Sequence, residues 1–140
     1  MNHLISSDTI AAQATASGEG GIAIVRISGS KCEEILARVF RAKNGKPLTN
    51  RVLTFGHVME GDRTVDEAMA VLFRAPYSYT REDVAEIHCH GSDTLVRRIL
   101  LLLLDAGAGM VIAAAIASAG RESKPKRIDE VFTVKPPTRS

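Results

Sequence analysis

Residues 83–91 read Asp83-Val-Ala-Glu-Ile-His-Cys-His-Gly91 and predict one short strand, followed by a helix that starts near Ser92. Successive side chains of a strand point to opposite faces, so Glu86, His88 and His90 share one face. A carboxylate and two imidazoles in a row are costly to bury unless each is paired or bound to something. The stretch therefore predicts a site on one face of this strand. The other face is apolar, suits a core, and holds Ala85, Ile87 and Cys89.

Length and composition set bounds on the class of protein. The chain has 140 residues, which suits one domain or one compact domain with a tail. Hydrophobic residues make up 45%, enough for a real core. The net charge of +2 and an aromatic content of 4% without tryptophan argue against nucleic acid as the direct partner.

Cysteine usage and hydropathy indicate where the chain works. Cys32 and Cys89 are the only cysteines, and no signal peptide precedes them, so we expect a reducing, cytoplasmic location. The longest aliphatic run, residues 99–104, is far too short to cross a bilayer, and we expect no membrane partner.

The order of apolar patterns predicts an α+β fold, with a mostly antiparallel sheet of about five strands and two main helices. The first two strands are close in the sequence and predict a hairpin. Ser28 or Ser30 is expected to cap the first helix, and Ser92 or Asp93 the second. The expected strands cover residues 8–15, 22–28, 52–59, 67–73 and 83–91, and the expected helices cover residues 30–41 and 92–106.

Two segments suggest how the domain is bounded and what covers it. Residues 100–104 are five consecutive leucines, too many for one buried stripe, and a second subunit is expected to cover part of this helix. After Gly109 the chain becomes alanine-rich and then charged and proline-containing. We therefore expect one domain over residues 1–109 and a divergent, partly disordered tail over residues 110–140.

The glycine-rich segment at residues 18–21 has only half of a phosphate-binding loop. It lacks the Gly-Lys-Ser/Thr ending and lies between two expected strands, so it predicts a hairpin turn. No complete phosphate-binding loop occurs elsewhere in the sequence. We accordingly expect no GTP site in this chain and no catalysis by it alone, and no residue stands out as a nucleophile or general base.

His88 and His90 allow a metal-dependent enzyme as a less favoured interpretation. Zinc requires three or four ligands in a tetrahedral array, and Cys89 points to the other face of the strand. The remaining histidines, His3 and His57, have no spacing that supplies the missing ligands.

Arg26 and Glu86 are charged residues inside otherwise apolar strands. The planar guanidinium of arginine suits a carboxylate or a planar heterocycle. A buried carboxylate can accept two parallel N–H donors at once. If the two strands are neighbours, either an ion pair or a ligand would satisfy both side chains, and the residues alone leave both possibilities open.

Four segments resemble, in the same order and spacing, the N-terminal domain of the MnmE/TrmE family of tRNA modification GTPases. They cover roughly residues 8–108. Four segments together are a specific signal, unlike any single one. The segments are Asp8-Thr-Ile-Ala-Ala-Gln-Ala-Thr15, Gly20-Gly-Ile-Ala-Ile-Val-Arg-Ile-Ser-Gly29, Ala75-Pro-Tyr-Ser-Tyr-Thr80 and Glu82-Asp-Val-Ala-Glu-Ile-His-Cys-His-Gly91.

The resemblance implies that this domain binds a tetrahydrofolate, such as 5-formyltetrahydrofolate, and forms a homodimer. It implies Arg26 and Glu86 as cofactor-binding residues, with the glutamate accepting the two adjacent N–H donors of the pterin edge. In the family the full-length protein works with the flavoprotein MnmG on the wobble uridine of certain tRNAs, and the folate supplies a one-carbon unit. We therefore expect tRNA to be only an indirect partner of this chain.

The match to the family stops after Gly109. The family's Pro-Gly-Glu-Phe block and its Asn-Gly-Lys segment, whose lysine also contacts folate, are absent. This loss suggests a truncated, frame-shifted or deliberately shortened chain, and it keeps open a second interpretation: a structural remnant that dimerises without a competent folate site. Further departures are Glu19 in place of an arginine or similar residue, Ala16 and Ser17 in place of prolines, and Arg81 and Ser92 in place of glycines.

Overall fold

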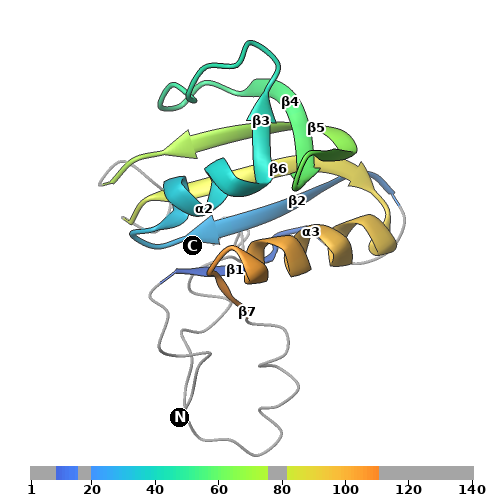
Figure 1. Cartoon of the computed structure of the whole chain (residues 1–140). Coiled ribbons are helices and arrows are strands. Elements are labelled where there is room, and N and C mark those ends of the chain that lie inside the picture. The colour runs from blue at the N-terminus through green and yellow to red at the C-terminus, as the bar shows by residue number, and fades with distance from the viewer. Residues whose placement is uncertain (1–8, 16–19, 76–81, 111–140) are drawn as a thin grey trace, which may run out of the picture.

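The strand expected at residues 83–91 forms as β6 (Val84–Gly91) and lies in the middle of a seven-stranded sheet. The computed structural model describes residues 9–15, 20–75 and 82–110 (Figure 1). The other strands are β1 (Ile10–Gln13), β2 (Gly20–Ser28), β3 (Phe40–Ala42), β4 (Thr54–Glu60), β5 (Arg63–Phe73) and β7 (Gly109–Met110), and the helices are α2 (Cys32–Val39) and α3 (Asp93–Asp105).

The sheet order is β3-β4-β5-β6-β2-β1-β7. Every neighbouring pair is antiparallel except β1 with β7, which is parallel. The expected hairpin is confirmed, because β1 pairs with β2 from Ile10 opposite Ser28 to Gln13 opposite Val25. The mostly antiparallel α+β fold is likewise confirmed, although the sheet has seven strands instead of about five.

The two strands that were not expected are the shortest. β3 starts directly at the end of α2, where Phe40 adopts extended angles, φ −124° and ψ 137°. The apolar spacing of Phe40 fits the helix stripe, so the sequence pattern continued the helix through a residue that belongs to the sheet. β7 has two residues, too few to show any periodicity, and pairs with Ile10 and Ala11.

The caps of the two helices differ. Ser92 caps α3 as expected, and its Oγ accepts a hydrogen bond from the Leu95 N–H at 3.3 Å. The expectation that Ser28 or Ser30 caps α2 was wrong. The N-cap of α2 is Lys31, which has no side-chain cap and whose own N–H donates to Thr9 Oγ1 at 3.0 Å. A side chain distant in the sequence thus supplies the polar contact near this helix start.

Both helices lie on the same side of the sheet (Figure 1) and enclose the core against it. We call this side the helix face. Ala85, Ile87 and Cys89 of β6 belong to it and are buried, as the alternation predicted. On α3 the leucines divide, since Leu100 and Leu103 are buried whereas Leu101 and Leu104 are exposed.

The cysteines are both free and lie in this core. Burial, reinforced by nearby acidic groups, raises the pKa of Cys32 to about 12. Burial raises the pKa of Cys89 to about 11. Because the thiolate is the reactive form, both thiols are inert at neutral pH.

Several sequence expectations concern residues outside the described ranges. They include the loop expected at residues 76–81, which contains part of one segment of the family resemblance. They also include the departures at Glu19 and Arg81, and the tail over residues 111–140. Within residues 9–15, 20–75 and 82–110, neither helix has the length and hydropathy needed to cross a membrane.

Candidate functional site

The pairing of β2 with β6 places Arg26 directly opposite Glu86. Both side chains lie on the side of the sheet away from α2 and α3, which we call the second face. The two residues are 60 positions apart in the sequence. The expectation that their strands might be neighbours is therefore met, and the ion pair forms between them.

Arg26 contacts one oxygen of the Glu86 carboxylate. Arg26 Nε donates to Glu86 Oε2 at 2.8 Å, and Arg26 Nη2 lies 2.7 Å from the same oxygen. The two side chains are only 9% and 13% exposed. A charge pair removed from water to this degree is held by short, charge-assisted bonds, which are stronger than neutral ones.

His88 contacts the other oxygen of the same carboxylate, with Nε2 2.8 Å from Glu86 Oε1. Burial alone would raise the pKa of Glu86, but the hydrogen bond from His88 and the charge and hydrogen bond of Arg26 outweigh it and lower the pKa. The carboxylate is thus ionised at neutral pH and can only accept, so His88 Nε2 carries the shared proton. Sequence reasoning placed His88 on the right face but did not pair it, although its spacing of two from Glu86 is a usable signal.

His90 extends the polar row on β6, with Nδ1 2.9 Å from Asp66 Oδ2 of β5. The hydrogen bond and charge of Asp66 raise the pKa of His90. Each of the three polar side chains predicted for one face of β6 is therefore paired within the chain. We call Arg26, Glu86 and His88 the polar row.

The described residues do not bring together enough side chains to hold a metal ion. In residues 9–15, 20–75 and 82–110, no three histidine, cysteine or acidic side chains come together as a metal would require. Cys89 belongs to the helix face, as the strand alternation predicted, and so lies opposite the two histidines.

A hollow of about 350 Å³ lies next to the polar row. It includes His88 and His90 of β6, together with apolar side chains from three neighbouring strands and the segment before β4. Ile22, which belongs to it, is 66% exposed. This size and lining are typical of the part of a site that takes an aromatic or apolar ligand body. The apolar side chains are Ile22, Leu53, Phe55 and Met69.

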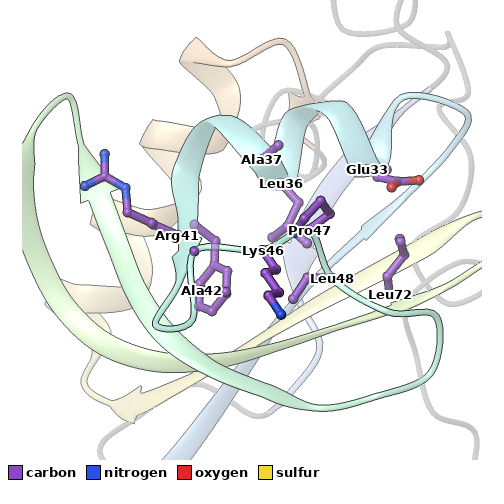
Figure 2. A pocket seen from close by; sticks show the side chains of 11 residues that line it. Glu33, Leu36, Ala37, Arg41, Ala42, Lys46, Pro47, Leu48 and Leu72 are labelled. Carbon is purple, nitrogen blue, oxygen red and sulfur yellow. The ribbon is translucent and has the colours of Figure 1, made fainter.

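A second hollow, of about 260 Å³, lies beside α2 and is separate from the polar row. Figure 2 shows Leu36, Lys46 and Leu48 close together beside the helix, with Arg41 and Glu33 at opposite ends. Glu33 is already paired with Arg74. Neither hollow is lined by Arg26 or Glu86, but the first one includes His88, which contacts Glu86.

The second face therefore offers an ionised carboxylate, a guanidinium and an imidazole beside an apolar hollow. Hydrogen-bond acceptors and donors on rigid strands suit recognition of a flat polar ring, and the hollow suits an apolar body attached to it. Such an arrangement suits binding better than catalysis, since the carboxylate and the guanidinium are engaged with each other.

Comparison with known proteins gives a consistent picture. The family described as GTP-binding protein TrmE N-terminus matches residues 9–125. The tRNA modification GTPase MnmE of Symbiobacterium thermophilum is 50% identical over 109 residues, which cover 74% of this chain and 24% of the relative. MnmE of Syntrophotalea carbinolica is 51% identical over 107 residues, covering 75% and 24%. The chain spans about a quarter of the length of the curated relatives it matches.

Proposed function

This chain belongs to the family of the TrmE N-terminus, and we propose that it is the tetrahydrofolate-binding, dimerising module of a GTPase that modifies tRNA. Relatives that are about half identical carry the name tRNA modification GTPase MnmE and are roughly three times as long. In a full-length protein of this kind, the folate would supply a one-carbon unit to the wobble uridine. The flavoprotein MnmG would be the partner, and the cytoplasm the compartment.

The polar row is the observation that carries this proposal. Glu86 is ionised and lies on a strand next to an apolar hollow. The edge of a pterin has two adjacent N–H donors, for which a carboxylate is the natural acceptor. In our proposal the pterin binds at Glu86, and the aryl group attached to it extends past His88 toward Ile22 and Phe55.

Isothermal titration with 5-formyltetrahydrofolate tests this proposal. We expect the wild type to bind and Glu86→Ala to lose binding. Because removing one member of a buried pair also weakens the fold, the second variant carries Arg26→Met together with Glu86→Leu, which leaves no buried charge. Binding that persists in this double variant would contradict a folate site at the polar row.

The matched control is another arginine–glutamate pair, Arg98 with Glu60, which lies at the surface. Replacing both members, Arg98→Met with Glu60→Leu, should leave folate affinity unchanged. A loss of binding here as well would point to a general effect on the fold.

A structural remnant without a competent folate site is the second candidate. The observation that favours it is that both oxygens of Glu86 already have partners inside the chain. A carboxylate satisfied in this way needs no ligand for stability. A folded, dimeric wild type that takes up no folate in the titration would establish this candidate in place of the first.

Dimerisation is supported by α3, where Leu101 and Leu104 are 51% and 39% exposed. Neighbouring apolar side chains on a helix surface are a common mark of a subunit interface. We expect light scattering to give the mass of a dimer for the wild type and of a monomer for Leu101→Glu with Leu104→Glu. A dimer that survives both substitutions would place the interface elsewhere.

A further inference from the structure

We propose that His88 is a positioning residue that competes with the ligand for Glu86 and thereby sets which heterocycles the site accepts. This inference rests on the proposed function, because it concerns the same carboxylate. It goes further in assigning a role to His88, and in stating that the site must exchange a bond before a pterin can bind.

The argument starts from the number of acceptor positions. An ionised carboxylate has about four of them, two on each oxygen. Two nitrogens of Arg26 lie within 2.8 Å of Oε2, and Nε2 of His88 lies 2.8 Å from Oε1. Among the described residues, one position on Oε1 is therefore open, whereas both positions on Oε2 face Arg26. A ring edge with two parallel N–H donors would need both positions on Oε1, and His88 holds one of them.

One resident donor must leave, and His88 is the one whose release is least costly. The Arg26 guanidinium is charged and its side chain is 9% exposed, so releasing it would separate a buried charge from the carboxylate that neutralises it. The His88 side chain is 26% exposed, and its freed N–H can turn to water. The carboxylate can then turn about its last side-chain bond and present the freed position, since that torsion has a broad range.

The exchange predicts a selectivity that a merely structural histidine would not produce. A ring with one donor fits the single open position and leaves His88 in place. A ring with two donors must displace His88 and forfeits that hydrogen bond. Removing the donor of His88 should therefore help the two-donor ring and leave the one-donor ring unaffected.

Titration of His88→Phe tests this prediction, because phenylalanine keeps an aromatic ring on the strand and removes both ring nitrogens, including the Nε2 donor. The probes are 5-formyltetrahydrofolate, which has two adjacent donors, and its 2-desamino analogue, which has one. We expect the affinity ratio of the first probe to the second to rise about tenfold relative to the wild type, the size of one hydrogen bond to a charged group. His88→Leu, which lacks the donor but differs in shape, should change the ratio in the same direction.

The matched control is His57→Phe, the same substitution on β4, where the imidazole packs edge-to-face against the ring of Phe55. Its ratio should equal that of the wild type. An unchanged or lower ratio in His88→Phe, with folate still bound, overturns the role of His88 and leaves the proposed function standing. Binding of folate by His88→Phe and not by the wild type supports the role. If neither protein binds folate, the proposed function is overturned, and the proposed competition between His88 and the ligand is overturned as well.

Discussion

The two faces of β6 carry the same strand but differ in almost every physical respect. The helix face holds Ala85, Ile87 and Cys89, which are buried among the side chains of α2, α3 and the neighbouring strands. The second face holds Glu86, both of whose carboxylate oxygens have partners, and His88, whose Nε2 is one of those partners. The comparison teaches that one strand can carry buried apolar side chains on one face and paired charged groups on the other, and that the two faces should respond differently to substitution and to pH.

The largest effect is expected on the helix face. Ile87 is fully buried, and Ile87→Ala should lower the free energy of unfolding by about 2 to 5 kcal/mol, through lost burial and the cavity left behind. Urea unfolding followed by circular dichroism measures this change. Ile22→Ser, at an exposed position, should change stability by less than about 0.5 kcal/mol. Equal effects at the two positions would remove the distinction between the faces.

On the second face, a single substitution should destabilise the fold far more than the double substitution that removes both charges. Glu86→Leu alone leaves the Arg26 guanidinium buried without its carboxylate and should destabilise by about 3 kcal/mol. Adding Arg26→Met should restore most of that loss, because the second charge is removed as well. A double variant no more stable than Glu86→Leu would mean that the polar row contributes to the fold as much as the core does.

Acid should weaken the second face selectively. The pKa of Glu86 is lower in the folded chain than in the unfolded chain. The contribution of the ionised carboxylate is therefore complete above the ordinary glutamate pKa of about 4.3, and is lost as the pH falls through the lower folded value. Between about pH 5 and pH 3, the urea midpoint of the wild type should fall more than that of Arg26→Met with Glu86→Leu. Parallel curves would contradict the lowered pKa.

The smallest effect is expected at His90, which is exposed and lies beyond the polar row on β6. Asp66 raises the pKa of His90, so this pair contributes below the ordinary histidine pKa of about 6.5 and fades as the pH rises through the raised value. The melting temperature of the wild type should therefore drop slightly more than that of His90→Phe between about pH 6 and pH 8. Because the side chain is solvent-exposed, screening by salt should abolish the difference.

Much of this arrangement was predictable from local patterns. The period of two gave the faces of β6 directly, and the glycine-rich turn between two apolar runs gave the hairpin of β1 and β2. The sequence could not predict that Arg26 contacts Glu86; it showed only that they would pair if their strands were neighbours. Their distance depends on which strands become neighbours, and that is decided by packing across 60 residues.

What the sequence pattern missed has a common physical cause. Phe40 has the spacing of a helix residue, yet pairing with Val58 of β4 draws it into the sheet. At the start of α2 the Lys31 N–H donates its hydrogen bond to Thr9, on a segment 22 residues earlier. In each case a contact distant in the sequence overrides a local preference. The hydrogen bond between His88 and Glu86 differs, because the two residues are only two positions apart. The sequence showed that they share a face of the strand, but the pairing was not predicted from it.

The position of β6 between β5 and β2 has a consequence for synthesis on the ribosome. The hairpin of β1 and β2 emerges first, and the strands β3, β4 and β5 follow as a second unit. Among the described strands, none joins the two units in the sheet until β6 has been translated, so the hydrogen-bonding edge of β2 stays open while all three strands are made. An open strand edge invites pairing with other chains. The nascent protein is thus most exposed to misassembly just before residue 91 leaves the exit tunnel, and a chaperone that covers β2 would act in that interval.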